Sequence, residues 1–487
     1  MKITTTNATS TFSDPLWLVL DQGGHASRAM VFDQQGQQIT QAYADISTQY
    51  LGSDRVEHNP KEIVESLQHV IHEVAHSLGK DSSRVRAAGL ATQRSSIVCW
   101  HKQNGQALSS VLSWQDRRNL ALVNELMPHQ AKIQQLTGLV LSAHYGASKI
   151  RWCLDHLSEV RSALRENNLY CGPLASYLLY SLLNEQPYVV DPANASRTQL
   201  WSPQCSNWSL PLLHYFGIPS GLLPQSVPTH FNYGLMPFAD RTIPLRVCTG
   251  DQAVAPFANG SLQDHTLYIN LGTGAFILAP LSQSIEHAAP LLRSVLCSDE
   301  HKTIYALEGT VNGAGSALSW WQERTDMELW PILNSFNRSD VSSRSIPLFI
   351  NAVGGIASPF WLPSNQSRFI DAPNSNAHEH LYAIVESIAF LINANIELMR
   401  THLPSTRRIV VGGGLSTCHY LNECIADLTQ LPVEVLSEHE LTAKGLAYLT
   451  AGEPPNWQDH GNTTVIRPTS NIPLKSRETS WLDHIKR

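Results

Sequence analysis

Residues 16–33 read LWLVLDQGGHASRAMVFD. The apolar run stops at Asp21, passes through a glycine-rich turn and resumes as a second apolar run, which predicts two strands joined by a tight turn. Residues 267–281, LYINLGTGAFILAPL, repeat this pattern around Gly272-Thr273-Gly274, roughly 250 residues later. A repeat at half the length of the chain predicts a duplicated architecture of two domains, each with one glycine turn.

The segments between these hairpins alternate in type, which predicts an α/β fold. A third buried strand, 408–411, runs into Gly412-Gly413-Gly414, and residues 422–429 resume as a helix. Helical periodicity extends over 60–78 and 381–399, and residues 86–100 predict two short strands around a polar corner. The crossover between the halves falls within 244–260. We expect an N-terminal domain over 1–252, a C-terminal domain over 253–455 and an irregular tail over 456–487.

The composition limits the classes of function. Hydrophobic residues make up 43% of the 487 residues, which provides for buried cores and excludes a mostly disordered chain. The 34 basic and 41 acidic side chains give a net charge of −7. A nucleic-acid-binding protein needs a basic face, so nucleic acid is not an expected partner.

Targeting signals are not evident in the sequence. The polar N-terminus has no apolar segment, and no run of about 18 apolar residues predicts a membrane span. The eight cysteines are scattered without a CxxC pair, which indicates a reducing compartment. We therefore expect a cytoplasmic protein that does not associate with membranes.

Three glycine turns at strand ends could converge on one nucleotide. Glycines allow backbone N–H groups to approach phosphate oxygens closely, and a carboxylate such as Asp21 beside phosphates commonly holds Mg²⁺. Arg28 could neutralise phosphate charge. The alternative for the first segment alone is an ordinary glycine hairpin, and each of the other turns is also a weak signal by itself.

A carboxylate follows another predicted strand. Asp251, after the strand 244–248, is placed to accept a proton from a substrate hydroxyl that attacks phosphorus, or else to cap a helix. Arg94 could donate two hydrogen bonds to adjacent hydroxyls, and Trp114 could pack its apolar ring against the carbon skeleton of a substrate. Both residue types are also common in structural roles. His378-Glu379-His380 lacks metal-site spacing and is interpreted as the start of a surface helix.

Four short segments occur in a characteristic order: SWQDRR at 113–118, NASRT at 194–198, YALEGTVNGAG at 305–315 and ESIAF at 386–390. Together with VEHNP at 56–60, Gln93-Arg94, 149–152 and the glycine turns, they resemble the FGGY family of carbohydrate kinases from about Leu16 to Gly452. Within that family the chain looks most like the glycerol kinases.

The resemblance implies two ribonuclease-H-like domains of the actin/hexokinase superfamily, with ATP and a sugar or polyol bound in the cleft between them. It implies that Asp251 is the catalytic base and that Asp21 and Asp251 lie near Mg²⁺. It places the acceptor substrate against Arg94, Ser95, Trp114, His144, Asp251 and Gln252. It places the nucleotide against Gly23, Gly24, His25, Arg28, Gly272, Thr273, Gly315, Ser319, Gly413 and Gly414. Relatives often form dimers or tetramers, so a homodimer or homotetramer is expected.

The sequence departs from the glycerol kinase pattern at several positions. Gly24-His25-Ala26 stands where those enzymes carry Thr-Thr-Ser, so two hydroxyl donors to phosphate are lost; His25 either replaces them through its charge or is a solvent-facing turn residue. Ser95 stands in place of a glutamate and His144 in place of a substrate-facing tyrosine. The catalytic aspartate is thus retained without the glycerol pocket, and a larger polyol or ketose fits the space at Ser95.

Leu362 replaces an acidic residue and Cys418 an asparagine expected near the adenine, which leaves the nucleotide preference open. The sequence therefore predicts ATP-dependent phosphorylation of a primary hydroxyl on a small polyol or sugar. The altered turn at 24–26 motivates the alternative of a catalytically degenerate relative that binds nucleotide or sugar as a regulator.

Overall fold

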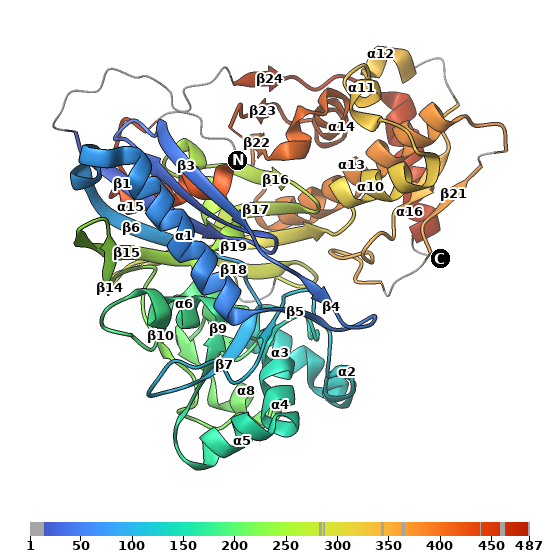
Figure 1. Ribbon diagram of the computed structural model, residues 1–487. Helices are drawn as coiled ribbons and strands as arrows, with labels where there is room; N and C mark the ends of the chain where they lie inside the picture. The colour runs from blue at the N-terminus through green and yellow to red at the C-terminus, as the bar shows by residue number, and fades with distance from the viewer. Residues whose placement is uncertain are drawn as a thin grey trace.

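Two mixed β-sheets form the centres of the two halves of the chain (Figure 1). The computed structural model describes residues 14–485 except 282–284, 286–287, 342–344, 363–365, 372, 439 and 458–462. Both glycine hairpins predicted from the sequence are present, one in each large sheet. The α/β class and the two-domain architecture are thus confirmed.

The N-terminal sheet has six strands in the order β14-β15-β6-β1-β2-β3. β1 pairs antiparallel with β2 and parallel with β6, and β6 pairs parallel with β15. Its strands are β1 (Leu16–Gln22), β2 (Ala26–Phe32), β3 (Gln38–Asp45), β6 (Val85–Thr92), β14 (His230–Phe238) and β15 (Arg241–Gly250).

The C-terminal sheet has seven strands in the order β18-β19-β17-β16-β22-β23-β24. β16 pairs antiparallel with β17 across the second glycine turn and parallel with β22, as β1 does with β2 and β6. This shared topology confirms the predicted duplication. The strands are β16 (Thr266–Leu271), β17 (Ala275–Leu281), β18 (Leu292–Ser298), β19 (Thr303–Val311), β22 (Arg408–Gly412), β23 (Val433–Val435) and β24 (Thr464–Ile466).

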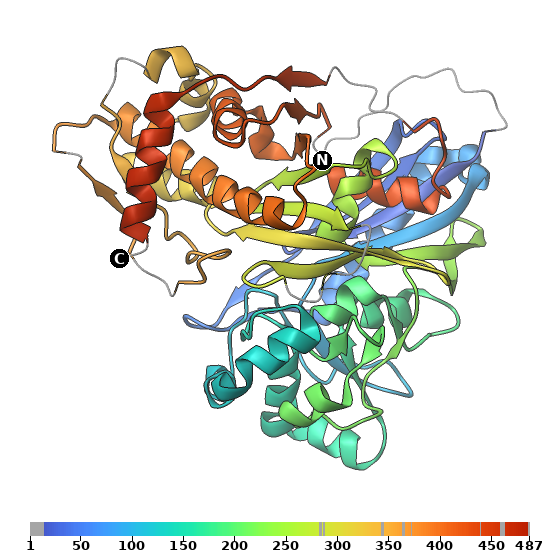
Figure 2. The same ribbon diagram turned by 180° about the vertical axis from the view of Figure 1, so that it is seen from behind.

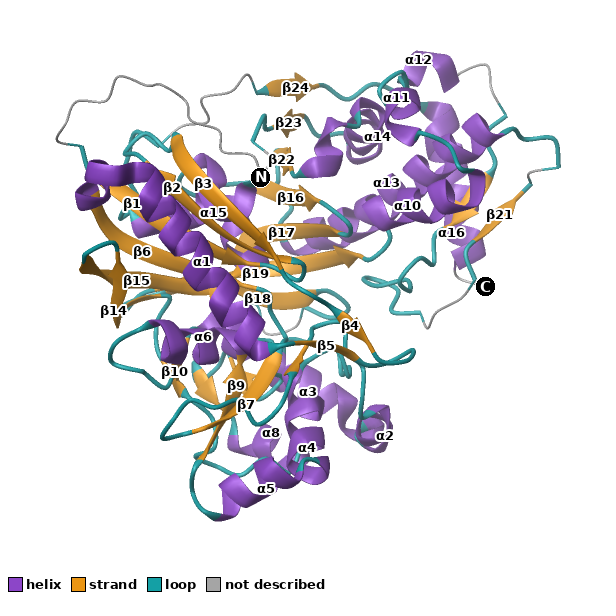
Figure 3. Cartoon of the chain, viewed as in Figure 1, coloured by secondary structure: helices purple, strands orange, loops and turns teal. Residues whose placement is uncertain are grey.

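A third region lies below the N-terminal sheet in Figures 1 and 3 and comes mainly from the chain between β6 and β14. Its five-stranded sheet has the order β4-β5-β8-β7-β9. The two strands predicted around the polar corner at 93–96 are β6 and β7, but they belong to different sheets. The strands here are β4 (Gln49–Tyr50), β5 (Val56–His58), β7 (Ile97–His101), β8 (Val111–Leu112) and β9 (Leu169–Pro173); the helices are α2 (Leu120–Glu125), α3 (Gln130–Thr137), α4 (Gly146–His156), α5 (Ser158–Arg165) and α8 (Leu210–Tyr215).

Helices cover the N-terminal sheet. α1 (Pro60–Leu78) matches the predicted helix; Asn59 caps its start by accepting a hydrogen bond from the Lys61 N–H, and it packs on β2 and β3. α6 (Leu174–Leu182) packs on β6, and α15 (Leu441–Thr450) packs on β1 and β6. α15 also contacts the 3-10 helix η3 (Ala255–Asn259), so one apolar cluster joins the two domains.

The long helix α13 (Ala377–His402) contains the predicted helix 381–399 and packs on β17 and β19. Asn376 and Glu379 form a capping box at its start, which confirms that His378 and His380 lie in a helix start. α13 is the one helix of the described ranges that is long and apolar enough to cross a membrane, but 83% of its most apolar window is buried inside the protein.

The prediction of an irregular C-terminal tail is wrong for two segments of 456–487. β24 extends the C-terminal sheet, and α16 (Ile472–Ile485) packs on α14 (His419–Thr429). The Trp481 indole is fully buried and donates a hydrogen bond to the Phe349 carbonyl. The sequence signal was weak because few residues of α16 are buried, namely Leu474, Trp481 and Ile485. Figure 2 shows α16, in dark red, along the outer side of the C-terminal domain.

Short elements complete the described part of the chain: α7 (Pro192–Ser196), α9 (Asp251–Val254), α10 (Gly315–Thr325), α11 (Leu329–Leu333), α12 (Arg338–Val341), β10 (Val189–Val190), β11 (Trp201–Ser202), β12 (Asn207–Trp208), β13 (Gln225–Ser226), β20 (Leu348–Ile350), β21 (Arg368–Ile370), and the 3-10 helices η1 (Gly79–Arg84), η2 (Met127–His129) and η4 (Gly414–Thr417).

Candidate active site

Three parallel strands of the N-terminal sheet end at the same edge. Gln22 of β1 is paired with Thr92 of β6, and Thr92 is paired with Gly250 of β15. Asp21 is the penultimate residue of β1, and Asp251 follows Gly250, the last residue of β15, directly. The carboxyl ends of parallel strands are where α/β folds bind ligands, so this register brings together the two carboxylates that the sequence singled out.

Asp251 is the first residue of α9, and its side chain is 26% exposed. Its Oδ1 accepts a hydrogen bond of 2.7 Å from the N–H of Gln252 and lies 3.7 Å from Nε of Arg94. Burial raises the pKa of Asp251, although Arg94 and the Gln252 N–H lower it. The residue at the N-cap of α9 is Gly250, and no described side chain caps this helix, which argues against the helix-cap alternative.

Arg94 connects the two domains. Its guanidinium is largely buried, and Nη1 donates a hydrogen bond of 3.2 Å to Oε2 of Glu308 on β19. Oε2 of Glu308 also accepts hydrogen bonds from Arg197, at 2.5 Å, and from the Ser294 hydroxyl, at 2.6 Å. Burial would raise the pKa of Glu308, but Arg197 and Arg94 lower it to about 2. Two guanidinium groups therefore share one ionised carboxylate at the domain junction.

Trp114 and His144 lie side by side. Their rings are 5.9 Å apart in an edge-to-face arrangement, and Trp114 is 38% exposed although it is large and apolar. A Cβ on Gly24 would lie 3.4 Å from Nε1 of Trp114, so the indole reaches the first glycine turn. Burial lowers the pKa of His144 well below its usual range, and Lys149 and Arg197 lower it further. His144 is therefore a neutral imidazole.

Ser95 and Gln252 complete the predicted acceptor contacts. Ser95 has a φ of 66°, and its buried hydroxyl has no hydrogen-bond partner among the described residues. Gln252 accepts a hydrogen bond of 3.0 Å from Asn270 of β16. Gln252 thus ties the segment after β15 to the end of the strand that leads into the second glycine turn.

The second and third glycine turns lie close together. Gly412 is paired with Asn270, and Gly413 has a φ of 93°, where a Cβ would lie 2.5 Å from Oδ1 of Asn270. Gly315 donates a backbone hydrogen bond of 3.0 Å to the Gly272 carbonyl, and a Cβ there would lie 2.8 Å from that oxygen. Only glycine fits these approaches. Thr273 lies in the same turn, and Ser319 is exposed on the first turns of α10.

The first glycine turn is closed by a hydrogen bond of 3.0 Å from the Gly23 N–H to the Ala26 carbonyl, and Gln93 donates to the Gly23 carbonyl at 3.1 Å. His25 at its tip is exposed. Arg28 forms a half-exposed ion pair of 2.6 Å with Glu440, just before α15. An exposed tip agrees with both alternatives for His25, a charge that meets phosphate and a solvent-facing residue.

Asp21 and Asp251 are the two carboxylates expected near Mg²⁺. The pKa of Asp21 is raised to about 7, chiefly by burial. The nearby Arg28 lowers this pKa, whereas Asp251 and Glu440 raise it. Oxygen donors whose charges repel each other fit a divalent cation. Within the described residues no group of three or more His, Cys, Asp or Glu could hold a metal by itself. The two carboxylates would fit a Mg²⁺ ion as oxygen ligands if phosphate oxygens or water completed its coordination.

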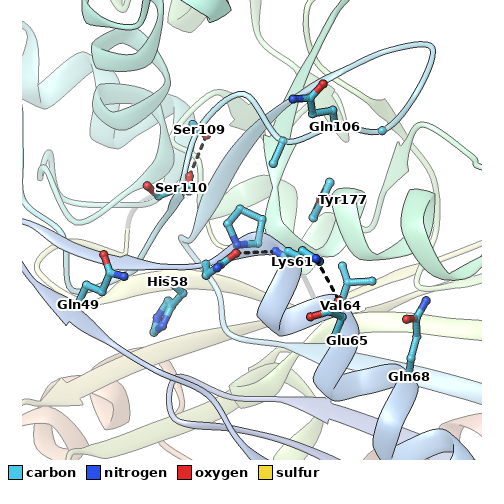
Figure 4. Close-up of a pocket in the computed structure, with 14 residues that line it drawn as sticks. Gln49, His58, Lys61, Val64, Glu65, Gln68, Gln106, Ser109, Ser110 and Tyr177 are labelled. Carbon is cyan, nitrogen blue, oxygen red and sulfur yellow. Dashed lines mark hydrogen bonds and ion pairs between the residues drawn. The ribbon is translucent and has the colours of Figure 1, made fainter.

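A cavity of about 690 Å³ lies elsewhere, between the start of α1, β5, the 105–110 segment and α6 (Figure 4). Lys61 and Glu65, which line it, form an ion pair, and Gln106 lies on the other side of the cavity (Figure 4). None of the predicted site residues lines this cavity. The chemistry at the strand ends therefore identifies the candidate active site better than cavity volume does.

Both halves of the chain match domains of a known protein family. The model of the N-terminal domain of the FGGY family of carbohydrate kinases matches residues 16–258, and that of the C-terminal domain matches residues 267–452. The chain belongs to this family of carbohydrate kinases. It is therefore a phosphotransferase with an alcohol group as acceptor, for which the family implies ATP as co-substrate and a small sugar or polyol as substrate.

Glycerol kinases are prominent among the relatives of this FGGY kinase. That of Trichodesmium erythraeum is 30% identical over 457 residues, which cover 91% of this chain and 90% of that protein. Glycerol kinase 2 of Thermotoga maritima is 29% identical over 454 residues, with 91% and 90% covered.

Solved structures share the fold. Plasmodium falciparum glycerol kinase with ADP superposes with a TM-score of 0.85 at 21% identity and covers 98% of both chains. A ligand-bound xylulose kinase from Lactobacillus acidophilus gives a TM-score of 0.81 at 16% identity and covers 97% of this chain and 96% of that one.

Three further residues of the candidate site are absent from the set predicted from the sequence: Arg197, Glu308 and Lys149. Arg197 and Glu308 lie within the NASRT and YALEG segments, and Lys149 opens the segment 149–152, so the signal was present in the resemblance. Their roles depend on contacts between distant segments, such as the 111 residues that separate Arg197 from Glu308. A local sequence pattern does not show such contacts.

Proposed function

We propose that this FGGY kinase transfers the γ-phosphoryl group of ATP to a primary hydroxyl of a small uncharged polyol or sugar larger than glycerol. The observation that carries the proposal is the position of Asp251 at the shared edge of β1, β6 and β15, with Nε of Arg94 3.7 Å from its carboxylate. A hydrogen-bond donor and a proton acceptor thus stand together where an acceptor hydroxyl would bind.

Asp251 would act as the general base. The acceptor oxygen forms a bond to the γ-phosphorus, the bond from that phosphorus to the oxygen of ADP breaks, and the hydroxyl proton passes to the Asp251 carboxylate. Burial raises the pKa of this carboxyl, which makes it a better proton acceptor than an exposed aspartate. Arg94 and Gln252 would hold the acceptor by hydrogen bonds beside it.

The glycine turns would hold the phosphates. Backbone N–H groups at Gly24 and Gly414 can approach phosphate oxygens because no side chain intervenes, and a Cβ on Gly414 would meet no described heavy atom within 4 Å. The N–H groups of Gly23 and Gly272 close their own turns by donating to the Ala26 and Gly274 carbonyls, so these glycines would shape the turns around the phosphates. Asp21 and Asp251 would hold Mg²⁺, which would supply positive charge against the phosphate oxygens. Arg28 would add a positive charge at the edge of the first turn.

The charges at the domain junction favour an uncharged acceptor. Arg94 and Arg197 are balanced by Glu308 and Asp251, and His144 is neutral. A carboxylated sugar would bring a further negative charge beside two arginines that already face carboxylates. A neutral polyol or ketose would add none.

The size of the acceptor follows from Ser95 and His144. The unpartnered buried hydroxyl of Ser95 can hydrogen-bond a substrate hydroxyl, whereas the glutamate expected from glycerol kinases would fill that space. The T-shaped pair of Trp114 and His144 provides an apolar wall with one imidazole edge. The homo-oligomer expected from the family resemblance and the cytoplasmic location expected from the scattered cysteines both stay predictions.

An ADP-release screen tests this proposal. Glycerol, erythritol, pentitols, ketopentoses, dihydroxyacetone and an aldonate would each be offered with Mg²⁺ and ATP. We expect the highest kcat/KM for a neutral acceptor of four or five carbons. Efficiency highest for glycerol would contradict the argument from Ser95 and His144, and efficiency highest for the aldonate would contradict the charge argument.

The same screen tests the alternative of a degenerate relative, which is motivated by Gly24-His25-Ala26. ADP release with any acceptor above the rate of ATP hydrolysis eliminates it. The variant Ser95→Glu combined with His144→Tyr should shift the preference of the enzyme toward glycerol, because it restores the two residues expected in a glycerol pocket.

A further inference from the structure

Lys149 lies on the first turns of α4, and its side chain is fully buried. Its ammonium group donates hydrogen bonds to three main-chain carbonyl oxygens: that of Ser95 at 3.0 Å, that of Ser113 at 2.6 Å and that of His144 at 2.8 Å. An ammonium group has three N–H donors, so each of them has an acceptor. All the acceptors belong to the backbone.

The three carbonyls belong to the three segments that carry the proposed acceptor contacts. Ser95 follows Arg94, Ser113 precedes Trp114, and His144 is itself one of the contacts. These segments follow β6, follow β8 and precede α4, so they are distant along the chain. Ser95 also has a positive φ, which a non-glycine residue adopts only where neighbouring contacts hold it.

We propose that Lys149 is a positioning residue for the acceptor substrate: it fixes Arg94, Trp114 and His144 relative to one another by tying the three backbone segments to one ammonium group. This inference rests on the proposed function. It assigns no contact between Lys149 and either substrate.

A purely structural role does not explain why a lysine occupies this buried position. Burial lowers the pKa of Lys149 to about 7, with Asp116 raising it and Arg118 and Arg117 lowering it further, so the charged form is costly in this position. An apolar side chain of similar length would fill the same volume without that cost. Residues that reduce stability and fix local geometry are typical of functional sites.

Two substitutions at the same position test the proposal. Lys149→Met is unbranched, one atom shorter than lysine and without any donor, whereas Lys149→Gln keeps two N–H donors. KM for the best acceptor of the wild-type protein and KM for ATP would be measured for both. Arg241→Met is the matched control, because Arg241 also donates to main-chain carbonyls, those of Ser82 and Val85, but at the opposite end of β15.

We expect Lys149→Met to lower kcat/KM for the acceptor by about 10-fold to 100-fold, chiefly through a higher KM, since a misplacement of about 1 Å costs up to about 10²-fold in catalysis. KM for ATP should stay within about 2-fold. Lys149→Gln should lie between the wild type and the methionine variant because it restores part of the hydrogen bonding. Arg241→Met should leave both KM values unchanged.

Other patterns overturn the proposal. An acceptor KM within 2-fold of wild type in Lys149→Met, equal rises in both KM values, or failure of both lysine variants to fold would each leave Lys149 with a structural role only. The proposed function fails separately: in that case the wild-type protein itself releases no ADP with any acceptor, before a variant is compared.

Discussion

Replacing Glu308 by Gln is expected to destabilise the protein at neutral pH and to weaken acceptor binding. The Glu308 carboxylate is buried between Arg197 and Arg94 and accepts a third hydrogen bond from Ser294. A neutral amide at this position would leave two buried guanidinium groups facing each other without a negative charge between them. Removal of one partner from a buried ion pair is strongly destabilising for this reason.

The magnitude follows from the pKa of Glu308. Burial would raise it, but the two arginines lower it from 4.5 to about 2, and each pKa unit corresponds to about 1.4 kcal/mol. The ionised form is therefore favoured in the folded state by about 3 kcal/mol. Because the folded-state pKa is the lower one, this stabilisation is complete above pH 4.5 and is lost as the pH falls from 4.5 toward 2.

Urea unfolding followed by tryptophan fluorescence measures the effect. At pH 7 the free energy of unfolding of Glu308→Gln should be about 3 kcal/mol below that of the wild type, and the difference should shrink between pH 4.5 and pH 3. Glu434→Gln is the matched control, because the Arg408–Glu434 pair at 3.1 Å is partly exposed and should contribute at most about 1 kcal/mol. A difference under 1 kcal/mol at pH 7, or one that does not change at acid pH, would refute the reasoning.

Two further predictions concern the phosphate side of the site. Burial raises the pKa of Asp21 to about 7, so its ionisation reduces the stability of the nucleotide-free protein as the pH rises from about 4 through 7. Asp21→Asn should therefore melt at a higher temperature than the wild type at pH 8 and at a similar temperature near pH 4. The variant should also lose Mg²⁺-dependent phosphoryl transfer. An Asp21→Asn variant that retains full activity would remove Asp21 from the metal site. Gly413→Ala should lower the thermal midpoint and the affinity for ATP. Gly413 has a φ of 93°, and an added Cβ would lie 2.5 Å from Oδ1 of Asn270, so the alanine should cost about 1–3 kcal/mol of stability. The adjacent Gly414→Ala should leave the thermal midpoint unchanged, because a Cβ there meets no described heavy atom within 4 Å. Equal midpoints in the two glycine variants would contradict the argument.

Much of the architecture could be predicted because its main elements have signals within short segments of the sequence. The hairpin around Gly23, the hairpin around Thr273 and the helix from Pro60 to Leu78 each have an apolar period and a turn or cap within a few residues. α16 was missed because it buries few apolar residues, so its period is faint. The strands flanking Arg94 were predicted, but their division between two sheets depends on partners distant in the sequence.

The candidate site was predictable to a similar extent. Asp21 and Asp251 stand out because each carboxylate follows an apolar strand, and the parallel register then brings the strand ends together. The partners that set the charges of the site could not be found in this way. Glu308 and Arg94 are 214 residues apart in the sequence, and Lys149 and Ser95 are 54 residues apart. Their hydrogen bonds can therefore be identified only in the folded chain.

The central claim concerns Asp251 as the base that accepts the acceptor's proton, and Asp251→Asn tests it most directly. The variant keeps an oxygen that can accept the Gln252 N–H but is a very poor proton acceptor. In the ADP-release assay with the best acceptor, kcat should fall by about 10²-fold to 10⁴-fold, while ATP still raises the thermal midpoint as it does for the wild type. Turnover close to that of the wild type, with nucleotide binding intact, would contradict the account.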